Sequence, residues 1–395
     1  MLPGLTQLSL HRQDEVATGM TADGVRAHKR EVKKLFDTPD LPVSSTSVER
    51  RQAHTADLKQ QRAGRYAAFS STLFVSLASR TPDAETLDAV AEFFEYVIEK
   101  RETPEFRRAL QRARVVPRIA ELMDASHPLH LREAAIHCLS AFTGATQVEA
   151  SVPAMAWEIL NTPHVARRLI DLLRADDGTY IVDGVLTLLV KITSGAMVYV
   201  KKPTLFAEWK SEKGDDLPAN AHGQPMAPVK GFLIDFAEND GAQAILALRI
   251  LNPVAKGSYS FRGEHDALEV LRNLVYVSMT VDGLQKRLLD VGMIEQLFRI
   301  ALVDKRDEGK SPIVDVVYEI VVHLLGPSST PAALPSVVQR VQPHLVDVLT
   351  WLKEKEEYGP QFYGALKFLH ECTRHKVLLE TVVSDKDFLA HIVAL

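Results

Sequence analysis

The sequence predicts an all-α fold, a right-handed α-solenoid of about six stacked repeats preceded by an extended N-terminal tail. From residue 66 onward, apolar residues recur at spacings of three and four, which is typical of amphipathic helices. The alternation of apolar and polar residues that indicates a half-buried strand is nearly absent. Equivalent helical segments recur every 46 to 50 residues apart from one larger gap, a period that indicates helical repeats burying their apolar faces against one another.

The composition narrows the class of protein and of partner. The 395 residues are 46% hydrophobic and 25% charged, as in ordinary soluble globular proteins. A net charge of -5 disfavours a polyanion as the main partner. The two cysteines, Cys138 and Cys372, do not imply a disulfide framework and fit a reducing compartment. No apolar run reaches the ~18 to 20 residues of a membrane helix, and the first residues do not read as a targeting signal, so we expect a cytoplasmic location.

Residues 1–65 differ from the rest of the chain. They mix proline, serine, threonine and charges without an apolar face that could pack, which predicts an extended, basic-biased tail. Its segment 26–36 holds five cations that could dock on a partner: Arg26, Lys29, Arg30, Lys33 and Lys34. An acidic protein surface, RNA and the groove of the chain's own solenoid are possible targets, and a tail kept soluble by its charge is the alternative.

The segment "ALEVLRNLVYVS", residues 267–278, shows how each helix divides into two faces. One face is apolar: Ala267, Val270, Leu271, Leu274 and Val277. The opposite stripe is polar: Glu269, Arg272, Asn273 and Tyr276. The next segment breaks at Gly292, where glycine relieves the backbone between two short helices that meet at a steep angle.

Residues 103–144 predict a first helix, a second helix, a turn marked by proline and a third helix. This order resembles the armadillo repeat, with two short helices and a longer inner one, and the resemblance covers residues 66–395. Further units with the same order are 152–195, 231–278, 282–326 and 335–372. When the third helices of these units are aligned with one earlier helix, one equivalent position in each is expected to be buried. These six positions are Phe93, Leu139, Leu189, Leu271, Val321 and Leu369. The larger gap holds an inserted loop at about 200–231, either functional or disordered.

No catalytic, cofactor-binding or metal-binding residues are expected. Phosphate-binding loops, nucleophile elbows and dinucleotide fingerprints are absent from the sequence. The segment "HECTRH" offers His370, Cys372 and His375, but positions 370 and 372 point roughly 200° apart on a helix. We therefore expect Cys372 in the core, His370 in solvent, and no enzyme.

Armadillo proteins that resemble nuclear-import adaptors hold basic peptides with Trp and Asn residues four apart on successive inner helices. Asn273 occupies the asparagine place here, but Glu269 stands in the tryptophan place. At the other units the same two places hold Ala91 and Glu95, His137 and Ala141, Thr187 and Lys191, Glu319 and His323, and Lys367 and Glu371. Because this ladder is missing, an import adaptor is not expected.

We expect a non-enzymatic, protein-binding scaffold, a subunit of a larger assembly that by analogy with other armadillo-like proteins is cytoskeletal or ciliary. The resemblance places the third helices on a concave groove. Its predicted partner-binding residues are Glu269, Arg272, Asn273, Tyr276, Glu319, His323, Lys367, Glu371 and Arg374. Arg272 and Tyr276 are the expected anchors. Binding on the convex side or the 200–231 loop stays open, as does an RNA-associated subunit that contacts phosphates with its tail.

Overall fold

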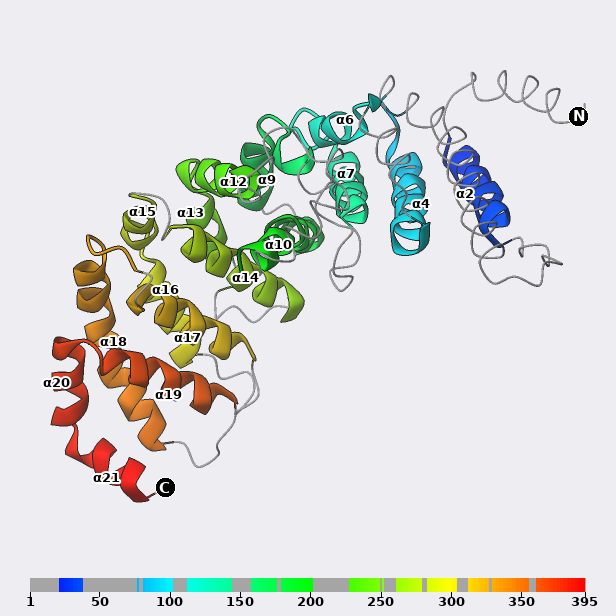
Figure 1. Ribbon diagram of the computed structural model, residues 1–395. Helices are drawn as coiled ribbons and strands as arrows, with labels where there is room; N and C mark the ends of the chain where they lie inside the picture. The colour runs from blue at the N-terminus through cyan, green and yellow to red at the C-terminus, as the bar shows by residue number, and fades with distance from the viewer. Residues whose placement is uncertain are drawn as a thin grey trace, which may run out of the picture. The chain divides into compact units, whose positions relative to one another are not determined.

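The computed structural model describes residues 21–37, 77, 81–101, 112–143, 158–175, 179–201, 227–248, 251, 261–278, 283–303, 312–326, 329–354 and 360–394. Within these ranges the regular secondary structure is helical and no strand occurs (Figure 1). The predicted all-α fold class is therefore confirmed over these ranges. The chain divides into two compact units, residues 1–168 with 198–228 and residues 169–197 with 229–395, which are described separately.

In the first unit, three helices lie side by side and a short helix packs on the third. They are α2 (Ala22–Asp37), α4 (Ala84–Arg101), α7 (Leu129–Phe142) and the short α6 (Val115–Glu121). Helix α4 lies between α2 and α7 (Figure 1). Aromatic rings fill the contact between α4 and α7, where the centroids of Phe94 and Phe142 are 4.1 Å apart. Phe93 and Leu139, two of the six predicted core positions, are fully buried here.

Helix α2 corrects the prediction of an extended tail. Residues 22–37 form a helix that packs on α4, so the prediction is wrong for this part of the tail. The physical reason is a short apolar face within the charged sequence, on which Ala22, Val25 and Val32 are all buried. Residues 1–20 and 38–65 of the predicted tail lie outside the described residues.

In the second unit, the third helices of successive repeats form one layer. They are α10 (Thr179–Lys201), of which residues 179–197 belong to this unit, α14 (Phe261–Ser278), α17 (Pro312–Leu325) and α19 (Pro360–Cys372). Helix α17 contacts α14 on one side and α19 on the other. The remaining predicted core positions, Leu189, Leu271, Val321 and Leu369, are all buried in this layer. The predicted register of these helices is therefore confirmed.

A second layer of the same unit packs on the first. It contains α16 (Met293–Val303), α18 (Leu334–Glu354), α20 (Lys376–Ser384) and α21 (Lys386–Ala394). Helix α18 contacts α16, α20 and α21. The short α15 (Leu284–Asp290) precedes α16, and Gly292 separates them with a φ of +76°. This left-handed conformation favours glycine, so the predicted break between two short helices is confirmed.

Three helices of the described ranges remain, one before α10 and two after the insertion, and the limits of the inserted loop need correction. They are α9 (Val165–Ala175), α12 (Ala227–Glu238) and α13 (Gly241–Leu246). Because α10 continues to Lys201 and α12 begins at Ala227, the predicted loop at 200–231 is too long at both ends. Pro228 did not prevent the helix, since proline is tolerated in the first helical turn. Residues 202–226 lie outside the described residues.

Candidate functional site

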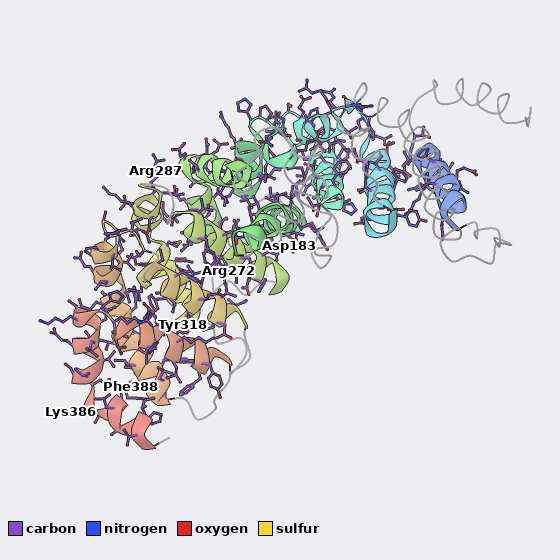
Figure 2. All side chains as sticks on the ribbon, in the orientation of Figure 1. Asp183, Arg272, Arg287, Tyr318, Lys386 and Phe388 are labelled. Carbon is purple, nitrogen blue, oxygen red and sulfur yellow. The ribbon has the colours of Figure 1, made fainter. Side chains whose placement is uncertain are left out.

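The residues predicted to bind a partner come together on three neighbouring helices of the second unit. We call this set the polar stripe: Glu269, Arg272, Asn273 and Tyr276 on α14, Glu319 and His323 on α17, Lys367 and Glu371 on α19, and Arg374 just after α19. Figure 2 labels Arg272 on the α14 ribbon. The predicted alignment of these positions is therefore realised on adjacent helices, because α14 contacts α17 and α17 contacts α19.

Arg272 is the centre of an ion-pair network between α14 and α17. Its Nη1 donates to Glu319 Oε2 at 3.1 Å, and its Nη2 donates to Glu269 Oε2 one turn away on the same helix. His323 Nε2 lies 2.5 Å from the Tyr276 hydroxyl and 3.6 Å from Glu319 Oε1. The side chains of Arg272, Glu319, Tyr276 and His323 thus hold one another in position.

The electrostatics of this network follow from its contacts. The hydrogen bond with His323 is the largest cause of the lowered pKa of Glu319, and together with Arg272 it brings this pKa to about 2 although burial opposes the shift. Burial raises the pKa of Glu269, although Arg272 and His265 oppose that rise. Burial also raises the pKa of the Tyr276 hydroxyl, so it keeps its proton and can donate it. The Glu319 carboxylate stays ionised well into the acidic range.

Three stripe residues are buried, which corrects the expectation that the whole stripe is open surface. Asn273 is only 2% exposed, and its Nδ2 donates to Thr193 Oγ1 on α10 at 2.9 Å. Glu269 and Glu371 are also buried. Their ion-pair partners lie close in the sequence, since Glu269 pairs with Arg272 and Glu371 with Arg374. Asn273 therefore joins two repeats and does not face a ligand.

The stripe also includes two residues that sequence reasoning missed, His265 and Asp266 on α14. Asp266 Oδ2 accepts a hydrogen bond from Thr187 Oγ1 on α10 at 2.9 Å. His265 Nε2 lies 3.8 Å from Glu269 Oε1, and the hydrogen bond with Asp266 is the main cause that raises the pKa of His265. The signal for both was their spacing of three and four residues before Glu269, which places them on the same helical face.

Two of the five predicted docking cations of the tail contact the chain's own α4. Arg26 Nη1 lies 3.1 Å from Glu85 Oε1, and Lys29 Nζ lies 3.2 Å from Glu92 Oε2. Arg30 Nε donates to the Arg26 carbonyl at 3.4 Å, and Lys33 is exposed. The side chain of Lys34 lies outside the described part of the chain.

The residues of "HECTRH" do not assemble a metal site. Cys372 is fully buried and burial raises the pKa of its thiol, while His370 is exposed, as predicted for both. His375 Nε2 lies 2.9 Å from the Leu325 carbonyl oxygen. Over the described ranges, no three or more His, Cys, Asp or Glu side chains are arranged to hold a metal ion.

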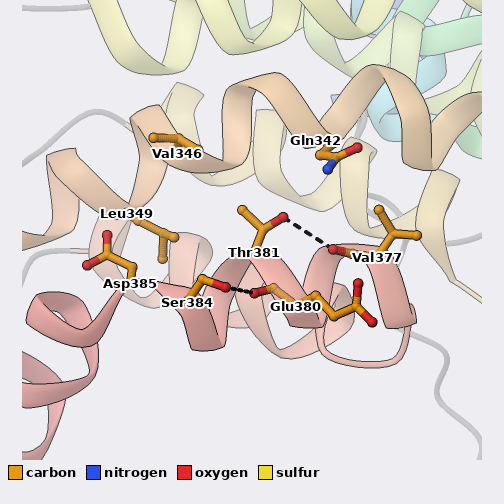
Figure 3. Close-up of a pocket in the computed structure, with 8 residues that line it drawn as sticks. All are labelled: Gln342, Val346, Leu349, Val377, Glu380, Thr381, Ser384 and Asp385. Carbon is orange, nitrogen blue, oxygen red and sulfur yellow. Dashed lines mark hydrogen bonds between the residues drawn. The ribbon is translucent and has the colours of Figure 1, made fainter.

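A groove between α18 and α20 is a further surface that the sequence did not indicate (Figure 3). It has a volume of about 470 Å³ and is lined by Gln342, Val346, Leu349, Val377, Glu380, Thr381, Ser384 and Asp385. Two of its apolar side chains face solvent, Val346 at 52% exposure and Val377 at 45%. Lys353 Nζ pairs with Asp385 Oδ2 at 2.8 Å, so this carboxylate is already neutralised.

None of the helices in the described ranges has both the length and the hydropathy needed to cross a bilayer.

Comparisons with known proteins give likenesses to solved structures only. No family model matches the chain, and no curated protein matches it. A designed armadillo repeat protein is 10% identical with a TM-score of 0.47, over 76% of this chain and 98% of that one. Two engineered proteins are 13% and 14% identical, with TM-scores of 0.47 and 0.48, each over 75% of this chain and over 96% and 94% of their own.

Proposed function

We propose that this chain is a non-enzymatic scaffold that binds protein along the polar stripe, as a fixed subunit of a larger assembly. The observation that carries the proposal is the cluster of Arg272, Tyr276, Glu319 and His323 on two adjacent helices. Arginine and tyrosine are enriched among the residues that dominate binding energies. Because these side chains already hold one another in place, a partner would order them at little further entropic cost.

The charges of the stripe indicate the kind of partner. Glu319 is acidic, Lys367 and Arg374 on the α19 side are basic, and all three are at least partly exposed. A mixed surface favours a helix or an extended segment of mixed charge over a polyanion or a basic peptide. A cytoskeletal or ciliary assembly rests on analogy with other armadillo-like proteins.

An RNA-associated role receives less support from the contacts. Arg26 and Lys29, two of the five tail cations offered for phosphate contacts, already face Glu85 and Glu92. A salt titration separates the two roles, because phosphate-driven binding weakens steeply with ionic strength and an apolar protein interface does not.

The test begins with cross-linking and mass spectrometry on the native protein to identify the partner. In capture assays with that partner, Arg272→Ala combined with Tyr276→Ala should weaken binding at least about tenfold while helical circular dichroism is kept. Arg287→Ala is the matched control, since Arg287 is an exposed arginine on α15 of the same unit.

A second pair of variants separates binding from folding. Both anchors also bond across α14 and α17, so thermal unfolding of each variant is measured first. Tyr276→Phe removes only the hydroxyl and keeps the ring, so it should retain most of the affinity if the ring makes the contact. Undiminished capture by the double variant would move the interface elsewhere, with the groove between α18 and α20 as the next surface to change.

A further inference from the structure

Helix α4 carries a row of carboxylates that the polar stripe does not include. Glu85, Asp88, Glu92 and Glu95 follow one another at intervals of three and four residues, which places them along one side of the helix. We call them the acidic row. His137 of α7 approaches the row from one side, with its ring nitrogens 3.4 Å from Asp88 Oδ1 and 3.7 Å from Glu95 Oε1.

Helix α2 shows what fits on the other side of the acidic row. Arg26 pairs with Glu85 at 3.1 Å and Lys29 pairs with Glu92 at 3.2 Å. Between these ion pairs, the His28 ring meets the Phe93 ring edge-on, with centroids 5.1 Å apart. Val25 and Val32 of α2 are buried. The surface of α4 thus receives a helix that combines a short apolar face with two cations spaced to match two carboxylates.

The apolar part of the contact between α2 and α4 is buried, whereas its charged part is open to solvent. The side chains of Arg26 and Glu85 are 43% and 70% exposed, and those of Lys29 and Glu92 are 31% and 51% exposed. Exposed pairs contribute little and are screened by salt. A helix of this length is marginal by itself in water, so it is helical only while it is docked. Residues 38–83 separate α2 from α4 in the sequence, so the two helices are not joined by a short turn.

We propose that the acidic row of α4 is a docking surface for a basic amphipathic helix of a partner protein, and that α2 covers this surface when the partner is absent. The helix that fits has apolar residues at its first and eighth positions and cations at its second and fifth. Val25, Arg26, Lys29 and Val32 show this pattern in α2. The surface belongs to the first unit and is separate from the polar stripe of the second.

The first experiment asks whether the surface accepts a helix from outside the chain. The probe is a fluorescent peptide with the sequence of residues 21–37, "TADGVRAHKREVKKLFD", added to the full-length protein. In a chain with Val25→Asp and Val32→Asp, α2 can no longer bury its apolar face and the surface is open. This chain should bind the peptide at least about tenfold more tightly than the wild type, where α2 competes as a tethered ligand.

The second experiment tests the charge pairing. With α2 released, Glu85→Lys and Glu92→Lys should weaken peptide binding at least about tenfold. A peptide with Arg26→Glu and Lys29→Glu should restore binding to this reversed chain and should not bind the unreversed one. Glu121→Lys on α6 is the matched control, because Glu121 is a partly exposed acid of the same unit that pairs with Arg118 and not with α2. It should leave peptide binding unchanged.

Several results would overturn the proposal. Equal peptide binding by the wild type and the released chain would show that α2 does not cover the site. If the charge-swapped peptide does not bind the reversed chain, the carboxylates of the acidic row do not determine which helix binds. If the two aspartates unfold the first unit, Arg26→Glu with Lys29→Glu in the chain releases α2 by repulsion from Glu85 and Glu92, and the same comparison applies. A wild-type dimer that the released chain cannot form would assign the surface to α2 of a second copy instead of a partner.

Discussion

Helices α17 and α19 approach closely at Gly364, and this contact allows a sharp test of the packing between repeats. A Cβ atom at position 364 would lie 2.4 Å from Asp315 Oδ1 and 3.3 Å from Tyr318 Cδ2. Tyr318 is 1% exposed and its ring stacks on Phe368 at 5.6 Å, so it has little freedom to move. Gly364→Ala therefore forces a shift of Asp315 or of the two helices.

The expected magnitude is the difference between two opposing effects. Alanine is favoured over glycine inside a helix by about 1 kcal/mol. Inserting a methyl group into a filled contact costs about 1–3 kcal/mol. The difference leaves a net loss of up to about 2 kcal/mol in the free energy of unfolding for Gly364→Ala, which corresponds to a Tm lower by up to roughly 4 °C.

Gly231→Ala is a close control, because Gly231 also occupies the fifth position of a helix, α12, and among the described residues no atom outside its own helix backbone and chain neighbours lies within 4 Å of its Cβ position. Only the helix propensity acts there, so its Tm should rise. Both variants are compared by circular dichroism melting and denaturant titration. In an Asp315→Ala background the Gly364→Ala penalty should largely disappear. A Tm that rises equally for Gly364→Ala and Gly231→Ala would refute the close approach of α17 and α19.

Two further predictions concern stability. Leu271→Ala should lower the free energy of unfolding by about 2–5 kcal/mol in denaturant titrations, because Leu271 is fully buried, and unchanged unfolding would mean that the register of α14 is wrong. Burial raises the pKa of Glu158 from 4.5 to about 7, so its contribution to stability is complete below about pH 4.5 and is lost as the pH rises through about 7. We therefore expect the Tm of the wild type to fall between pH 5 and 8 and Glu158→Gln to flatten that fall, and an identical pH profile would contradict the burial of this carboxyl.

Local periodicity explains why much of the fold could be predicted. The buried positions of α14 and α17 follow from apolar residues three and four apart, and this pattern holds whatever lies opposite the helix. Gly292 could be assigned to a helix boundary for the same reason, because its positive φ is a local property of the backbone. The wrong limits of the inserted loop arose at the end of helix α10, which continues to Lys201, and at the start of helix α12, whose first turn contains Pro228.

The sequence by itself determined the helical class, the register of the core and the helical face on which the polar stripe lies, because each depends on residues within a few turns of one another. Only the tertiary structure decided which polar residues stay accessible. Asn273 is bonded to Thr193, 80 residues away, and Arg272 to Glu319, 47 residues away. The docking of α2 on α4 also depends on a contact between residues far apart in the sequence, since Arg26 pairs with Glu85, 59 residues away. Such contacts depend on which helix of another repeat covers a given face, and that is set by the packing of the whole unit and not by the local pattern.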